Sequence, residues 1–243
     1  MTRRKGQDID GVLLLDKPEG LSSNFALQRA RRYLDAKKGG HTGTLDPFAT
    51  GLLICCFGKG TKLCATMLDA DKSYLATLSL GVETDSGDCT GIATQKNCDI
   101  EPTLEKIKDV LLKYTGEIEQ IPPMYSALKK DGKPLYKYAR EGIELERAAR
   151  KVTIFNIELI KYEYPTLILH VKASKGTYIR TLAQDIGRDL GCYAHLSALR
   201  RTAVGPFEIA NSIKLADFQE LEHPVGALIA LDDLPAEVAI KTN

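Results

Sequence analysis

The sequence lacks the features that mark membrane, secreted and metal-binding proteins. No apolar run among its 243 residues is long enough to cross a bilayer, and the charged start MTRRKGQDIDG has no apolar segment typical of a signal peptide. None of the six cysteines forms a CxxC pair, which suits neither a zinc site nor a disulfide framework. We therefore expect a cytoplasmic protein without a metal, whose thiols are reduced and mostly buried.

Two loops resemble ligand-binding motifs only superficially. The segment Gly58-Lys59-Gly60-Thr61 lacks the GK[ST] order and the glycine spacing of a phosphate loop, which excludes a nucleoside triphosphate site of that type. The acidic segment GVETDSGDCTG, residues 81–91, lacks the terminal bidentate glutamate of a calcium loop. A structural turn is the expected role of this acidic segment.

The net charge of +1 conceals an uneven distribution of charged residues. Residues 129–151 carry eight basic and four acidic side chains, and residues 172–201 carry six basic and two acidic side chains. Residues 208–243 carry seven carboxylates against two lysines. Such segregation is typical of a polyanion-binding face, although the patches vanish if the segments interleave in the fold.

The segment 121–151 combines proline and glycine with tyrosines among its basic residues. Tyr125, Tyr136 and Tyr138 alternate with lysines and arginines, a composition that suits nucleic-acid backbones and exposed bases. A solvated long loop with one short helix over 135–141 is the alternative.

Periodicity and turn residues predict alternating strands and helices. We expect strands over 11–15, 52–57, 72–80, 152–162 and 166–173 and within 192–206. We expect helices over 23–35, 62–69, 103–114, 135–141 and 177–190. The sequence contains no internal repeat, no low-complexity segment and no clear interdomain linker.

Two places in this pattern are candidate sites. Asp46 lies in a loop bounded by Gly43 and Gly51 and anchored by the apolar run that follows, and loops on rigid strands often display catalytic groups. Tyr178 and Arg180 lie at a strand-to-helix corner, another frequent position for site residues. The alternatives are an ordinary turn with a capping aspartate, and a tyrosine packed on the sheet beside a surface arginine.

Seven stretches, in this order, resemble the bacterial tRNA pseudouridine synthase B family. They are GVLLLDKPEGLSS, GHTGTLDPFATGLL, the KSY strand, LGVETDSGD, IPPMYSALKKDGKPLYKYAREG, SKGTYIRTLAQDIG and HLSALRRTAVGPF. The resemblance covers residues 11–207 and implies the α+β pseudouridine synthase fold, a mixed and mostly antiparallel sheet flanked by helices and loops. It also implies isomerisation of uridine to pseudouridine at position 55 in the T loop of tRNA.

The resemblance assigns roles to individual residues. They are Asp46 as the catalytic aspartate, Arg180 as its ion-pair partner, Tyr74 as the residue stacked on the uracil, Tyr178 and Leu199 as pocket-lining residues, and His41 as a contact of the flipped nucleotide. No cofactor is expected, because exchanging an N1–C1′ bond for a C5–C1′ bond is redox-neutral. The aspartate can serve as a nucleophile or as a base, and the sequence leaves both routes open.

The resemblance also sets expectations for domains and partners. Residues 1–225 would form the catalytic domain, with an RNA-binding insertion over about 121–151, and residues 226–243 would begin a C-terminal extension that is either missing or truncated. The expected partner is the T stem-loop of tRNA, bound by a monomer with no obligate protein partner. A non-catalytic RNA-binding protein and a carboxylate hydrolase are the alternatives. The first has no use for a carboxylate beside phosphates, and the second requires a second acid that is not evident.

Overall fold

The computed structural model describes residues 6–238, which form two compact units. The first unit comprises the chain up to Tyr74 and from Arg200 onward, and the second comprises Leu75–Leu199. Two strands, β4 (Lys72–Leu80) and β12 (Ala194–Val204), contribute residues to both units. The division expected near residue 225 stays a prediction.

The first unit is built on a sheet with the strand order β14-β1-β3-β12. Its strands are β1 (Gly11–Lys17), β3 (Thr50–Phe57), β14 (Ile213–Lys214) and the end of β12, with β2 (Gly39–His41) and β13 (Phe207–Glu208) paired alongside. The strands β1 and β3 are antiparallel, whereas β12 runs parallel to β3.

Two hydrophobic cores lie on opposite faces of this sheet. Alternate residues of β1 and β3 pack on one face against α1 (Ser23–Tyr33) and α6 (Leu215–Phe218). The residues between them pack on the other face with α2 (Leu63–Leu68), which follows the 3-10 turn η1 (Gly58–Lys62). Because β3 is covered on both faces, it reads in sequence as a continuous apolar run.

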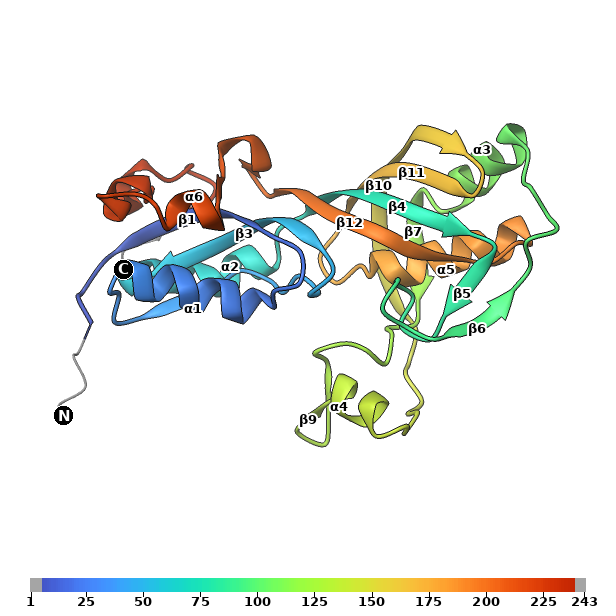
Figure 1. Cartoon of the computed structure of the whole chain (residues 1–243), viewed down its shortest axis with the longest axis horizontal. Coiled ribbons are helices and arrows are strands. Elements are labelled where there is room, and N and C mark those ends of the chain that lie inside the picture. Colours follow the sequence, from blue (N-terminus) through green and yellow to red (C-terminus); the bar gives the residue numbers. More distant parts are fainter. Residues whose placement is uncertain (1–5, 239–243) are drawn as a thin grey trace. The chain divides into compact units, whose positions relative to one another are not determined.

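The second unit has the strand order β12-β4-β11-β10-β7. Its further elements are β7 (Gly116–Gln120), β10 (Arg150–Glu163), β11 (Thr166–Ala173), α3 (Leu104–Lys113) and α5 (Ile179–Leu190). A two-stranded ribbon, β5 (Val82–Thr84) with β6 (Ala93–Lys96), adjoins this sheet in sequence. Figure 1 shows the insertion with β8 (Lys129–Lys130), β9 (Lys133–Pro134) and α4 (Leu135–Arg140) lying off the sheet.

The structure confirms the expected mixed sheet, with mostly antiparallel strands and flanking helices, and each helix and strand named in the sequence analysis. The pattern gave no sign of β2 and β7, which are short or half-exposed. The thiols are free, but Cys89 and Cys98 are exposed, so the expectation of mostly buried cysteines was too broad. No helix in the described part of the chain has the length and apolar character required to cross a membrane.

Candidate active site

The Asp46 loop, residues 42–49, connects β2 to β3 in the first unit. Asp46 is half-buried, and its carbonyl oxygen accepts a hydrogen bond from the backbone N–H of Ala49 at 3.1 Å. This turn contains Pro47, which disfavours a helical conformation at the preceding aspartate. The local sequence therefore ends the β2 strand and sets the aspartate in a tight turn before β3.

Several hydrogen bonds attach this loop to α1 and the preceding turn. The buried Ser23 hydroxyl accepts from the Leu45 N–H at 2.7 Å and donates to the Leu45 carbonyl at 3.0 Å. The Gly20 N–H donates to the Pro47 carbonyl at 2.8 Å. Because the backbone on both sides of Asp46 is held in this way, the loop is fixed by the fold.

Lys17, at the end of β1, is enclosed beside the loop. Its side chain is fully buried, and Nζ donates to the carbonyl oxygens of Leu21 at 2.7 Å, Pro18 at 2.9 Å and Pro47 at 3.4 Å. Burial lowers the pKa of Lys17 to about 8, while the negative charge of Asp46 opposes this shift. The ammonium group and the Asp46 carboxylate therefore interact within one unit.

Tyr74 and His41 also belong to the first unit. Burial raises the pKa of the Tyr74 phenol, and the charge of Asp46 raises it further, whereas Arg201 lowers it. Burial and the positive charge of Arg201 lower the pKa of His41, so its imidazole is neutral at pH 7. The Nδ1 atom of His41 is buried, and the imidazole also interacts with the backbone of Gly43.

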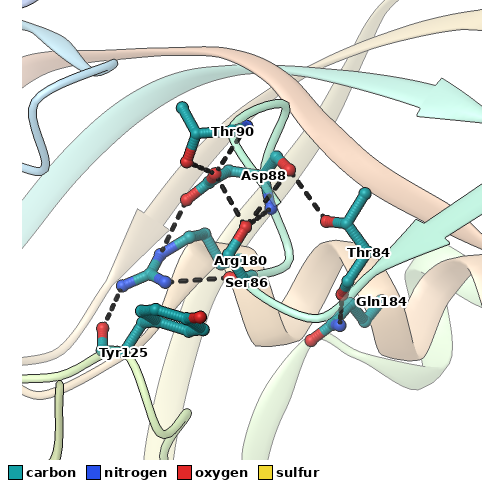
Figure 2. Close-up of polar contacts among 7 residues, drawn as sticks. All are labelled: Thr84, Ser86, Asp88, Thr90, Tyr125, Arg180 and Gln184. Carbon is teal, nitrogen blue, oxygen red and sulfur yellow. Dashed lines mark hydrogen bonds and ion pairs between the residues drawn. The ribbon is translucent and has the colours of Figure 1, made fainter. Parts of the chain in front are cut away.

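In the second unit, Arg180 starts α5 and is only 4% exposed. Figure 2 shows its guanidinium surrounded by acceptors from the acidic turn and from the start of the insertion. Nε lies 3.7 Å from Asp88 Oδ2, Nη1 donates to the Ser86 carbonyl at 2.8 Å, and Nη2 donates to the Tyr125 carbonyl at 2.6 Å. The acidic segment is thus a structural turn, as expected, and it also orients Arg180.

Asp88 is itself fixed by three hydrogen bonds (Figure 2). Its Oδ1 accepts from the Ser86 hydroxyl at 2.8 Å, the Thr90 N–H at 3.0 Å and the Thr90 hydroxyl at 2.6 Å. Gln184, one turn along α5 from Arg180, donates to the Thr84 carbonyl at 2.9 Å. Helix α5 and the acidic turn are therefore joined at two points.

Tyr178 and Leu199 complete the set of expected residues in the second unit. The guanidinium carbon of Arg150 lies 5.0 Å from the centre of the Tyr178 ring, a cation–π contact. The backbone N–H of Tyr178 donates to Gln120 Oε1 at 3.0 Å, which fixes the entry of α5. Leu199 is 7% exposed on β12.

The structure thus places His41, Asp46 and Tyr74 together in the first unit. It places Tyr178, Arg180 and Leu199 in the second. The expected ion pair between Asp46 and Arg180 stays a prediction. Within the described chain, no cluster of three histidine, cysteine or carboxylate side chains has the arrangement of a metal site.

Sequence reasoning did not identify four residues that support these groups: Lys17, Ser23, Asp88 and Arg201. Lysine and arginine are ordinarily placed on the surface, so nothing in the local pattern indicated that Lys17 and Arg201 are enclosed. One signal was present for Arg201, because it shares strand parity with the apolar Leu199.

Two family profiles together span most of the chain. Residues 31–179 match the TruB family pseudouridylate synthase (N terminal domain), and residues 180–238 match the tRNA pseudouridylate synthase B C-terminal domain. The second match includes the residues expected to begin a missing extension.

The chain is also similar to curated proteins and to solved structures. It is 61% identical to a tRNA pseudouridine synthase B of Bordetella avium, covering 97% of this chain and 98% of that protein. It is 56% identical to a tRNA pseudouridine synthase B of Aromatoleum aromaticum, covering 96% and 76%. The crystal structure of a Cbf5-Nop10-Gar1 complex contains a chain that is 30% identical, with a TM-score of 0.73, over 92% of this chain and 60% of that one.

Proposed function

This chain belongs to the TruB family of pseudouridylate synthases, and from that premise we propose that it isomerises uridine to pseudouridine in tRNA. The substrate position is the T-loop uridine at position 55. The proposal rests on the position of Asp46, a half-buried carboxylate in a loop that hydrogen bonds hold on both sides. A carboxylate fixed in this way is suited to act on a single flipped nucleotide.

The reaction breaks the N1–C1′ bond of uridine, turns the detached base and joins C5 to C1′, while C5 loses a proton and N1 takes one up. Asp46 acts either as a nucleophile, at C1′ or at C6, or as a base that removes a ribose proton. The ring of Tyr74 stacks on the uracil and offsets part of the free energy of unstacking, which amounts to roughly a few kcal/mol. The imidazole of His41 contacts the flipped nucleotide.

The remaining proposed roles belong to residues of the second unit. Arg180 pairs with the Asp46 carboxylate and favours its charged form, and the turn around Asp88 keeps the guanidinium in place. Tyr178 and Leu199 line the space in which the detached uracil rotates. These roles rest on the positions of the residues in the family motifs and on the contacts that fix each side chain.

The insertion is the proposed contact for the stem of the T arm. Lys129, Lys130, Lys137 and Arg140 are exposed there and can neutralise phosphates. A cation–π contact of 4.3 Å joins Lys133 to Tyr138, so the basic and aromatic side chains of this segment form one surface. The proposal includes action as a monomer in the cytoplasm on the T stem-loop, with no obligate protein partner.

The test uses a T-arm stem-loop RNA tritiated at C5 of uridine. Because C5 becomes the glycosidic carbon, each conversion releases its tritium to solvent. We expect release with the wild-type chain, none with Asp46→Asn, and nearly equal RNA affinity for both. Asp8→Asn, which changes an exposed aspartate of the same unit, is the matched control and should retain activity.

Two outcomes would contradict the proposal. Conversion by Asp46→Asn at a rate comparable to wild type would remove Asp46 from catalysis. Tight RNA binding by the wild type without tritium release would favour the alternative of a non-catalytic RNA-binding protein.

A further inference from the structure

Arg201 is the most enclosed cation of the first unit besides Lys17. Only 1% of its surface is exposed, and it is the largest of the fully buried side chains. Enclosing a guanidinium costs several kcal/mol unless its donors are satisfied. The acceptors of its hydrogen bonds therefore identify the part of the structure that Arg201 holds in place. None of the roles proposed above for the reaction uses this residue.

Its donors reach the two ends of the Asp46 loop. Nε donates to the carbonyl of Leu52 at 2.8 Å, just after the loop, and Nη2 donates to the carbonyl of Gly43 at 3.3 Å, near its start. A single rigid guanidinium thus spans the segment that displays Asp46. Arginine suits this task because its donors form a planar fork, whereas a lysine ammonium is one flexible point charge.

The backbone of Arg201 approaches the loop as closely as its side chain. In the parallel pairing of β12 and β3, Arg201 lies opposite Gly51, and a Cβ atom at Gly51 would fall 2.4 Å from the Arg201 carbonyl oxygen. Glycine at this position therefore allows β12 to lie directly against the end of the loop. The Arg201 backbone is held beside Gly51, and from there its side chain reaches the carbonyls of Gly43 and Leu52.

The same guanidinium faces the other groups of the first unit that are expected to contact the nucleotide. Burial raises the pKa of the Tyr74 phenol, and the positive charge of Arg201 opposes this shift. Its charge also acts on His41 and on Lys17. Arg201 therefore hydrogen-bonds to both ends of the loop and acts through its charge on Tyr74, His41 and Lys17.

We propose that Arg201 is a positioning residue that fixes the Asp46 loop in one arrangement for the reaction. The inference rests on the proposed function and adds to it a residue that does not touch the reacting atoms. Without the guanidinium, the carbonyls of Gly43 and Leu52 lose their shared donor, and the loop gains freedom while the rest of the sheet remains.

Hydrogen–deuterium exchange measures the loop directly and does not depend on activity. We expect Arg201→Gln to speed exchange of the amides of residues 42–52, with little change in α1 and β1. Arg29→Gln is the matched control, because Arg29 is an exposed arginine of the first unit whose guanidinium carbon lies 4.9 Å from the centre of the Phe25 ring on α1. The control should leave exchange in the loop unchanged.

Single-turnover kinetics with T-arm RNA measure the catalytic consequence. A displacement of about 1 Å can cost roughly 100-fold in rate, so we expect Arg201→Gln to lower the saturated rate by about 10- to 100-fold. The dissociation constant of the RNA should change by less than about threefold, which is under 1 kcal/mol. Arg201→Lys retains the charge but not the fork, and should recover only part of the rate.

Each outcome decides the inference. Unchanged exchange in the loop, an unchanged rate, or full recovery by Arg201→Lys would overturn the positioning role. Global unfolding of both variants would assign Arg201 to stability alone and would also overturn it. If the wild-type chain releases no tritium, the proposed function fails separately, and the exchange experiment still decides whether Arg201 fixes the loop.

Discussion

The Asp88→Asn variant tests whether the second unit depends on its buried charge pair. The Arg180 and Asp88 side chains are each 5% exposed, and Nε lies 3.7 Å from Oδ2. At an effective dielectric constant of about 20, two unit charges at this separation attract by roughly 4 kcal/mol. Removing one partner of a buried pair typically destabilises a protein by roughly 3–5 kcal/mol, because the other charge remains enclosed.

Asparagine retains the shape of aspartate and one carbonyl oxygen. That oxygen can still accept from the Ser86 hydroxyl and from Thr90, and Arg180 retains the carbonyls of Ser86 and Tyr125. We therefore expect a loss near the lower end of the range, about 3 kcal/mol in the free energy of unfolding. Pseudouridine formation should also fall, because the guanidinium loses the group that orients its Nε edge.

Urea denaturation at pH 7 measures the change in stability, provided that the dependence on urea concentration stays constant. Asp85→Asn is the control, since Asp85 is an exposed aspartate of the same turn whose Oδ1 accepts from the Ile92 N–H at 2.8 Å. The control should lose less than about 1 kcal/mol. An equally small loss for Asp88→Asn would refute the reasoning, because the buried pair would then contribute no more than an exposed hydrogen bond.

Two further predictions concern the first unit. Gly51→Ala should reduce the free energy of unfolding by more than about 2 kcal/mol, because its φ of 104° is strained for alanine and the new Cβ would overlap the Arg201 backbone. Gly20→Ala, with φ of 82° and open space, should lose only about 1 kcal/mol, and equal losses in urea denaturation would contradict the overlap. The pKa of Lys17 is about 8 in the fold against 10.5 as the ordinary value, so between these pH values the unfolded chain holds a proton that the folded chain has released. Stability contributed at this site therefore rises with pH across that window, by an amount on the order of 3 kcal/mol, and the rise should be absent in Lys17→Met when both are unfolded in urea at pH 7.5 and pH 10. Parallel pH dependence of the two proteins would contradict it.

The sequence was sufficient to predict those helices and strands whose ends or burial are marked by nearby residues. Helix α5 begins after Gly176 and Thr177 and ends at Gly191, whose φ of 85° is the left-handed conformation that the pattern predicts for a terminating glycine. The apolar run that became β3 was recognisable because both faces of this strand are buried. Family motifs then identified the candidate residues on these elements, although not how each one is held.

The support for those residues depends on contacts between distant parts of the chain. The hydroxyl that fixes Leu45 comes from Ser23 on α1, and the carboxylate beside Arg180 comes from a turn that precedes it by most of the second unit. A charged residue read in isolation is expected at the surface, so the burial of Lys17 and Arg201 could not be deduced from periodicity. Only the packing of the sheet determines which charged side chains are enclosed.

The buried cations bind backbone carbonyls, and this explains why their contacts could not be predicted from the sequence. Arg201 binds the carbonyls of Gly43 and Leu52, Lys17 binds those of Pro18, Leu21 and Pro47, and Arg180 binds those of Ser86 and Tyr125. Every residue type carries a backbone carbonyl, so these partners leave no trace in the amino-acid pattern. For the same reason the acceptors cannot be removed by substitution, and these particular contacts can be removed only by changing the cation that makes them. Loss of activity with intact RNA binding should therefore follow from substitutions at these cations, and not from conservative changes at the residues whose carbonyls they bind.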